Sequence, residues 1–257
     1  MKLSKYAGKI KKQSVSGSHL NTRLNINSKY SSNNLISWQY KKIKFKKNST
    51  ILDLGCGNGA QAEFLVNKIG QNNILHCVDL SKKSIGLLNK KIKSDKIKTY
   101  VRNMDQLEEF FNLKIDIFHS SYSLYYSSKP KKILDHCYKL LNKGGKFIVT
   151  VPSYPHTMVQ DVNTIKKIPK NVDESLKFYS FFLKKYFDNK FRTTKVYNFK
   201  NELIIPKLND YLKMYRATTY YDQNILDELK ILIKSKIKKY GYYKVHKNAK
   251  LLIATKI

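Results

Sequence analysis

Three glycines at alternate positions are the most specific chemical signal in the sequence. The stretch ILDLGCGNGA places Asp53 two residues before the first of the glycines Gly55, Gly57 and Gly59. Glycines between a strand and a helix let the backbone approach a ligand closely, and the start of the helix adds free N–H donors. Asp79 lies 20 residues beyond Gly59, where a carboxylate can accept hydrogen bonds from a ribose diol. This spacing predicts a site for an adenosine-containing ligand.

The glycines alone leave the class of ligand open. Gly55, Gly57 and Ala60 also satisfy the dinucleotide pattern G-x-G-x-x-G/A, so a nicotinamide enzyme is an alternative. No Gly-Lys-Ser/Thr follows the loop, which argues against a triphosphate-binding loop. No group of His, Cys, Asp or Glu has the spacing of metal ligands, so we predict no metal site.

Short apolar runs alternate with amphipathic stretches from residue 50 onwards, which is typical of βαβ units and a parallel sheet. The predicted strands are Thr50–Leu54, Ile74–Asp79, Ile97–Val101, Ile115–His119 and Lys146–Val151. The predicted helices between them are Gln61–Ile69, Lys82–Ile92, Gln106–Phe111 and Pro130–Leu141. Pro152 and Pro155 are expected to end the fifth strand, because proline lacks a ladder N–H. We therefore expect an α/β fold: a doubly wound, Rossmann-like, mostly parallel sheet of seven strands.

The segments before and after these strands are predicted to form an N-terminal arm, a cap and the end of the sheet. Residues 1–48 are polar and basic and are predicted to form an N-terminal arm with a short helix in NNLISWQYKKIKF. The main domain covers 49–257, and within it 153–222 is too long for a simple connection, so we predict a cap insertion over the ligand site. After a helix at Asn224–Lys239, the runs YYKVHK and LLIATK are predicted to form a terminal antiparallel hairpin that turns near Asn248.

The net charge of +32 on 257 residues suggests a nucleic-acid partner, but the composition argues against one. Only four of the 50 basic residues are arginines, the side chain suited to bidentate contacts with bases and phosphates. The lysines are spread along the whole chain. We interpret them mainly as solvated faces, and keep a surface for RNA, an anionic membrane or an acidic substrate as the alternative.

The cysteines and the lack of long apolar runs indicate in which cellular compartment the protein is expected. The cysteines Cys56, Cys77 and Cys137 are odd in number and widely spaced, so they predict neither a disulfide framework nor a zinc site. No run of 18 apolar residues could span a membrane, and no apolar segment follows the basic N-terminus as in a secretory signal. We therefore expect a cytoplasmic protein.

Taken together, the motifs resemble the class I S-adenosylmethionine-dependent methyltransferases. The run I-L-D-L-G-C-G-N-G followed by V-D-L-S is typical of that family, including the acid at Asp53. The third strand ends in Asn103-Met104-Asp105, where the family often has an acid or amide. The run LLNKGGKF enters the fifth strand as the family's L-L-x-x-G-G-x-F/L segment does. This resemblance covers about residues 49–152 and is closer than the one to nicotinamide enzymes.

The resemblance implies S-adenosylmethionine as the cofactor and gives its contacts. The implied cofactor-binding residues are Asp53, Gly55, Gly57, Gly59, Asp79, Asn103, Met104 and Ser120. In this family the glycines would line the amino acid and ribose, Asp53 would lie near the methionine end, and Asp79 would hold the ribose hydroxyls. Asn103 and Met104 would meet the adenine; Asn103 departs from the more usual Asp, but an amide can still accept the adenine amino hydrogen. Ser120 would open onto the methionine portion.

The methyl acceptor has to be inferred from absent motifs and from the predicted cap. The segment HSSYSLYY after the fourth strand is not the Asp/Asn-Pro-Pro-Tyr/Phe segment of adenine amino methyltransferases, and no Pro-Cys pair supplies the thiolate of a cytosine C5 enzyme. The aromatic residues in 153–222 suit a pocket wall, and the layout is similar to methyltransferases of small metabolites, including the histamine methyltransferase-like enzymes. We expect methyl transfer to an O or N atom of a small metabolite. The alternatives are a methyltransferase for RNA or protein and a non-catalytic cofactor-binding protein.

Few residues need to act chemically, since a general base is required only if the acceptor loses a proton as it attacks. His156 is the predicted base, and Tyr122 and Tyr126 are predicted to face the methyl group. The wider pocket candidates are Tyr125, Arg216 and Tyr220. Of these, Arg216 could bind a substrate carboxylate or phosphate. His119 is interpreted as an ordinary strand residue.

Overall fold

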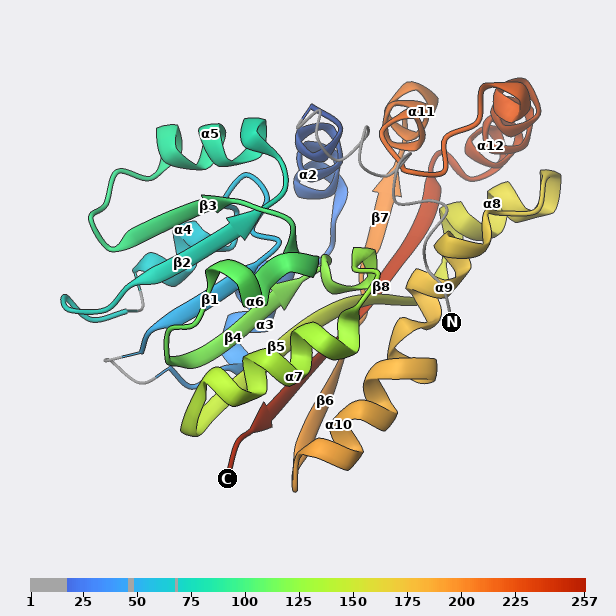
Figure 1. Ribbon diagram of the computed structural model, residues 1–257. Helices are drawn as coiled ribbons and strands as arrows, with labels where there is room; N and C mark the ends of the chain where they lie inside the picture. The colour runs from blue at the N-terminus through green and yellow to red at the C-terminus, as the bar shows by residue number, and fades with distance from the viewer. Residues whose placement is uncertain (1–17, 46–48, 68) are drawn as a thin grey trace.

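The computed structural model describes residues 18–45, 49–67 and 69–257. The strands are β1 (Ile51–Leu54), β2 (Leu75–Asp79), β3 (Ile97–Val101), β4 (Ile115–Ser121), β5 (Leu141–His156), β6 (Thr194–Phe199), β7 (Glu202–Ile205) and β8 (Tyr243–Thr255). They form one open sheet of eight strands in the order β3-β2-β1-β4-β5-β8-β6, and β7 also pairs with β8 (Figure 1). β1 to β5 run parallel, whereas β8 runs antiparallel to its neighbours β5, β6 and β7. The predicted α/β class is confirmed.

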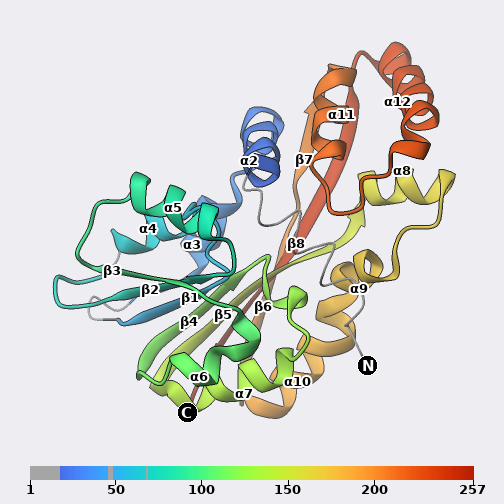
Figure 2. The same cartoon turned by 45° about the horizontal axis from the view of Figure 1, so that its top comes forward.

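Helices cover both faces of the sheet (Figures 1 and 2). They are α2 (Ser18–Tyr30), α3 (Leu35–Lys42), α4 (Ala62–Val66), α5 (Lys82–Lys91), α6 (Leu107–Phe110), α7 (Pro130–Leu140), α8 (Thr157–Ile165), α9 (Lys170–Phe178), α10 (Lys184–Lys190), α11 (Leu208–Arg216) and α12 (Leu226–Tyr240). Three short 3-10 helices are η1 (Met104–Gln106), η2 (Leu124–Tyr126) and η4 (Gln223–Ile225), and η3 (Tyr179–Leu183) is a short π-helix. One face carries α3, α4 and α5, and the other carries α6, α7 and α10.

The sequence of β1 explains why the sheet is sandwiched between helices. Ile51 packs in the hydrophobic cluster under α3, α4 and α5, while Leu52 and Leu54 pack in the cluster under α6, α7 and α10. All four residues of the strand are buried. A parallel strand covered on both faces reads as a nearly continuous apolar run. Asp53 is the exception in this run, which marks it as a residue with another role.

A second group of elements packs beyond the sheet and joins distant parts of the sequence. The helices α2, α8, α11 and α12 share one hydrophobic cluster with β7 and the first half of β8. Figures 1 and 2 show α2 between α5 and α11. The described part of the predicted N-terminal arm is thus packed on the domain, because Ile26 of α2 is buried in this cluster. None of the helices in the described ranges is long and apolar enough to cross a membrane.

The predicted terminal hairpin is wrong in detail, although the antiparallel strands at the end of the chain are confirmed. The runs YYKVHK and LLIATK are two halves of the single strand β8, and Asn248 lies within it. The first half of β8 pairs with β7 and the second half with β6, while β5 lies on its other side. Both halves therefore find partners in 194–205, and the sheet has eight strands where seven were predicted.

The prolines after β5 do not end that strand, contrary to the prediction. Pro152 pairs with Ala249 of β8, and the ladder continues to His156 after an irregularity beyond Ser153. The neighbouring strand β4 ends at Ser121, opposite Thr150. Past that point one edge of β5 no longer pairs with β4, and proline is tolerated on such an edge and at a bulge.

Candidate active site

The three glycines form a tight loop between β1 and α4. Their φ angles are +78° at Gly55, +56° at Gly57 and +83° at Gly59, a region that strains other side chains. A Cβ atom on Gly55 would lie 2.2 Å from the Cβ of Ser123. The backbone N–H of Gly55 donates to the carbonyl of Val78 at 2.7 Å, which ties the loop to β2. The loop therefore requires glycine both for its conformation and for the close approach of η2.

Asp79 joins the glycine loop to the start of α5. Its carboxylate accepts hydrogen bonds from the backbone N–H of Gly57 at 2.9 Å and from that of Ser81 at 2.8 Å. Burial raises the pKa of Asp79, and these backbone hydrogen bonds oppose that shift. A carboxylate has about four acceptor positions, so the two bonds leave acceptor capacity at the carboxyl end of β2.

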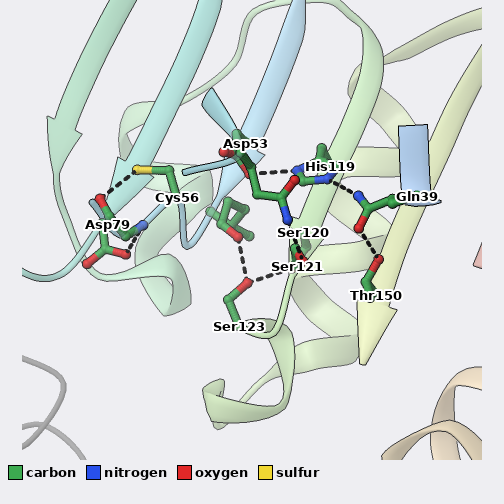
Figure 3. A network of polar contacts seen from close by, with 12 residues as sticks. Gln39, Asp53, Cys56, Asp79, His119, Ser120, Ser121, Ser123 and Thr150 are labelled. Atoms are coloured by element: carbon green, nitrogen blue, oxygen red, sulfur yellow. Dashed lines mark hydrogen bonds and ion pairs between the residues drawn. The ribbon is translucent and has the colours of Figure 1, made fainter. Parts of the chain in front are cut away.

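Asp53 belongs to a buried polar network (Figure 3). Its Oδ1 lies 2.8 Å from Nδ1 of His119, whose Nε2 lies 2.8 Å from the amide nitrogen of Gln39. The amide oxygen of Gln39 accepts from the hydroxyl of Thr150 at 3.0 Å. Because the Gln39 amide nitrogen can only donate, Nε2 of His119 accepts and Nδ1–H donates to Asp53. The network fixes the tautomer of His119 and leaves Oδ2 of Asp53 buried without a hydrogen-bond partner among the described residues.

The segment after β4 packs against the glycine loop. Ser123 donates to the carbonyl of Leu54 at 2.6 Å, and its oxygen lies 2.7 Å from that of Ser120 (Figure 3). Tyr122 has a φ of +56°, and it is the one residue other than glycine with a positive φ in the described part of the chain. Such conformations cost about 1–3 kcal/mol and cluster at functional sites. The strained tyrosine sits where the sequence predicts contact with the methyl group.

Asn103 and Met104 lie at the carboxyl end of β3, as predicted. The side-chain oxygen of Asn103 accepts from the N–H of Asp105 at 3.1 Å and so caps η1. Met104 packs against the core cluster under α7. The carboxylate of Asp105 accepts from the hydroxyl of Ser127 and from the N–H of Ser128, which ties the ends of β3 and β4 together. Asn103 keeps a second lone pair on its oxygen for a ligand.

Arg23 of α2 lies near enough to two tyrosines for its charge to affect them. Burial raises the pKa of Tyr125 and Tyr220, and the nearby charge of Arg23 opposes the shift in both. Tyr125 also packs against the exposed Tyr126 with tilted rings, whose centroids are 4.5 Å apart. The predicted candidates Tyr125, Tyr126 and Tyr220 are therefore brought together. Arg216 is not part of this group, since it is exposed at the end of α11.

His156 ends β5 beside Lys247 of β8, its partner in the antiparallel register. The side chain is 9% exposed, and its Nδ1 has no hydrogen-bond partner among the described residues. Burial, and then the charge of Lys247, lower the pKa of His156 to about 3. The imidazole is therefore neutral near pH 7.

Sequence reasoning missed four residues of this region: Gln39, His119, Arg23 and Lys247. Nothing in the local pattern distinguishes Gln39 or Lys247 from the many other polar residues. A histidine directly after the apolar pair Ile117-Phe118 of β4 was the available signal for His119, and scarcity was the signal for Arg23, one of four arginines.

Two surface hollows are lined by other residues. One of about 730 Å³ is lined by residues of α7, α9 and η3, including Pro130, Phe178 and Phe182. Another of about 410 Å³ lies between α8 and α9. Neither is lined by a predicted cofactor residue, so the site is assigned from the loop geometry and the polar contacts.

Together, the doubly wound sheet, the glycine loop and Asp79 at the carboxyl end of β2 define a nucleoside-binding α/β domain. A family model described as a methyltransferase domain matches residues 45–218. The chain belongs to this methyltransferase family, which confirms the resemblance to the class I S-adenosylmethionine-dependent methyltransferases.

Solved structures have the same fold. A candidate methyltransferase from Bacillus halodurans shares 18% identity with a TM-score of 0.62, over 86% of this chain and 98% of that one. The YcgJ protein from Bacillus subtilis shares 13% identity with a TM-score of 0.59, over 86% and 97%. Phosphoethanolamine N-methyltransferase 2 from Haemonchus contortus, in complex with S-adenosyl-L-methionine, shares 17% identity with a TM-score of 0.54, over 86% of this chain and 52% of that one. No curated protein sequence matches the chain.

Proposed function

We propose that the protein transfers a methyl group from S-adenosylmethionine to an O or N atom of a small metabolite. The observation that carries the proposal is the placement of two acids around the glycine loop in a chain of net charge +32. Asp79 has acceptor capacity beside the loop, and Asp53 has an unpartnered buried oxygen at the end of β1. A cationic sulfonium compound requires such local negative charge inside a basic protein.

The chain's residues fit the parts of this cofactor. Asp79 would accept from the ribose hydroxyls while it holds the loop through Gly57. Oδ2 of Asp53 would accept from the cationic amino group of the methionine part, with Nδ1–H of His119 orienting the carboxylate from behind. Asn103 and Met104 would border the adenine, and Ser120 would lie at the methionine end. The glycines keep side chains out of the space that the ligand would occupy.

The cofactor supplies a methyl group on a sulfonium, and the protein has to align the acceptor and exclude water. An acceptor lone pair would displace the sulfur at the methyl carbon, and the electron pair of the carbon–sulfur bond would leave with the sulfur. Alignment of this kind can contribute roughly 7–11 kcal/mol. Tyr122 and Tyr126 are our candidates for facing the methyl group. With a pKa of about 3, His156 is a weak base at neutral pH and suits a hydrogen bond to the acceptor better than proton removal.

Two further features favour a small acceptor. Tyr125 packs against Tyr126, and Tyr220 lies near Tyr126 and Arg23. We assign these tyrosines to a pocket wall, and 153–222 with α2 to the cover of this site. The Haemonchus contortus enzyme was also solved with phosphomonomethylethanolamine, a small molecule, although this chain spans only about half of that protein. The cysteines of the described residues are all unpaired and buried, which fits the reducing compartment that we propose.

The test is to incubate the pure protein with methyl-labelled S-adenosylmethionine and extracts of its host cells. The label is then separated into small metabolites, RNA and protein. Label among small metabolites supports the proposal. Label in RNA or protein would show that the lysine-rich surface binds the substrate, and would replace the proposal by its alternative.

A further inference from the structure

Two basic side chains in the tyrosine cluster have no acidic partner. The salt bridges among the described residues do not include Arg23 or Lys247. Residues 1–17, 46–48 and 68 contain no Asp or Glu, so they cannot supply a side-chain carboxylate. Among the described residues, the ammonium of Lys247 donates to one side chain, the amide oxygen of Asn27 in α2, at 3.2 Å.

An acid of the same region already has other partners. Asp161 of α8 accepts from the hydroxyl of Tyr211 at 2.9 Å and from that of Tyr243 at 2.6 Å, and lies 3.9 Å from the ammonium of Lys236. Its acceptor positions are directed at these partners. Asp161 therefore does not neutralise Arg23 or Lys247.

The charges of Arg23 and Lys247 repel each other across the cluster. Burial, and then the charge of Arg23, lower the pKa of Lys247 from 10.5 to about 7. An arginine cannot relieve such repulsion by losing its proton. Both side chains are partly buried, and two like charges held close together in such a place are costly unless an opposite charge joins them. The arrangement is therefore incomplete without an anion.

The unpartnered nitrogen of His156 points to the same conclusion. His156 lies beside Lys247 in the β5–β8 ladder, is 9% exposed, and leaves Nδ1 without a partner among the described residues. A buried polar atom of this kind is rare unless a ligand or water completes it. Two cations, a neutral imidazole and the hydroxyls of Tyr125 and Tyr220 together provide the donors that an oxyanion requires.

The position of this cluster relates it to the glycine loop. Leu20 of α2 would lie 3.2 Å from a Cβ on Gly57, and Asn21 accepts from the side-chain amide of Asn58 at 2.6 Å. Arg23 follows Leu20 by three residues, which is about 4.5 Å along a helix axis. One turn of α2 therefore spans from the cofactor loop to the cationic cluster.

We propose that Arg23 and Lys247, with His156, bind an anionic group of the methyl acceptor, so that the substrate is a small metabolite carrying a carboxylate or a phosphate. This inference rests on the proposed function and narrows it to one chemical class. The short span along α2 limits the distance between the anionic group and the atom that receives the methyl group. The lysines on the outer surface are not required for this recognition.

The test measures anion binding apart from cofactor binding. Inorganic phosphate and acetate are titrated separately by calorimetry into the protein saturated with S-adenosylhomocysteine. The variants are Arg23→Gln and Lys247→Gln. Their matched controls are Arg216→Gln, at an exposed arginine of α11, and Lys244→Gln, at an exposed lysine on the same strand as Lys247.

We expect one of the two anions to bind the wild type, and each of the two cluster variants to weaken that binding at least tenfold. The controls should bind it as the wild type does, and all variants should bind S-adenosylhomocysteine within about threefold of the wild type. Binding of phosphate would indicate that the methyl acceptor carries a phosphate, and binding of acetate would indicate a carboxylate. Binding should be accompanied by proton uptake near pH 8, because an anion raises the pKa of Lys247 between Arg23 and His156; buffers of different ionisation enthalpy report it.

Two results would overturn the inference alone: wild-type protein that binds S-adenosylhomocysteine but neither anion, or anion binding that both cluster variants retain. Wild-type protein that fails to bind S-adenosylhomocysteine would instead refute the proposed function. If Arg23→Gln does not fold, Arg23→Lys, which keeps the charge, should fold and retain part of the anion affinity. Anion binding to the wild type that occurs without proton uptake would also count against a role of Lys247, even if the two cluster variants lose that binding.

Discussion

Replacing Asp79 by alanine separates the two roles that the structure gives to this carboxylate. Two hydrogen bonds from ribose hydroxyls to a charged acceptor are worth about 1.5–3 kcal/mol each. Their loss should weaken S-adenosylhomocysteine binding by roughly 100-fold to 10,000-fold, at 1.4 kcal/mol per tenfold. Calorimetry should therefore detect little or no binding to Asp79→Ala.

The same substitution should destabilise the protein without unfolding it. The N–H groups of Gly57 and Ser81 lose their acceptor. An unsatisfied N–H costs about 1–3 kcal/mol, but relief of the buried charge on Asp79 offsets part of this. We expect a net loss of about 2 kcal/mol in the free energy of unfolding, which most domains tolerate. Urea unfolding followed by circular dichroism measures it.

Asp79→Asn is the matched control. It is neutral but keeps one acceptor oxygen, so we expect intermediate affinity, about 10-fold to 100-fold below the wild type. A folded Asp79→Ala protein that binds S-adenosylhomocysteine as the wild type does would refute the assignment of Asp79 to the ribose.

Three further predictions concern stability and the loop. Gly55→Ala should cost roughly 2–4 kcal/mol of unfolding free energy and abolish cofactor binding, because it adds left-handed strain and a Cβ only 2.2 Å from that of Ser123; unaltered urea unfolding would contradict the loop geometry. His119→Leu should cost roughly 2–4 kcal/mol, because it leaves Asp53 buried without its hydrogen-bond partner; a loss below about 0.5 kcal/mol would show that the network contributes little. Lys247→Met should stabilise the ligand-free protein at pH 7 by about 2 kcal/mol. This is less than the lowered pKa of Lys247 implies at about 1.36 kcal/mol per pKa unit, because the side chain is partly exposed to solvent. Since the folded pKa of about 7 lies below the unfolded 10.5, the unfolded state binds more protons between these values. Wild-type stability should therefore rise from pH 7 to pH 9 more steeply than that of Lys247→Met, and parallel profiles in thermal unfolding would refute the buried ammonium.

The parallel half of the fold could be predicted because its determinants are local. Alternating apolar runs place β1 to β4 to within two residues, and the glycine loop with Asp79 identifies the ligand edge. The antiparallel half depends on pairing between distant segments. Asn248 reads as a turn residue, but β6 and β7 supply partners along the whole of β8. No local pattern shows that two ladders will hold this segment straight.

For the part of the site that would bind the methyl acceptor, the sequence predicted the types of residue but not which arginine contributes. An arginine among tyrosines was expected, and Arg216 lies within the predicted cap of residues 153–222. Packing of α2 between the glycine loop and α11 brings Arg23 there instead, while Arg216 faces solvent. His119 reads as a strand residue until β1 and β4 pair and place it opposite Asp53. Both outcomes follow from tertiary contacts that a single sequence does not display.

The central claim is that the protein methylates a small anionic metabolite held by Arg23. The most direct measurement is anion-exchange chromatography of the labelled small-molecule fraction after incubation with methyl-labelled S-adenosylmethionine and host-cell extract. The account predicts a labelled product that the exchanger retains, that forms with wild type and Arg216→Gln, and that is lost with Arg23→Gln. A labelled product that is uncharged or cationic and forms equally with Arg23→Gln, or label confined to RNA or protein, would contradict it.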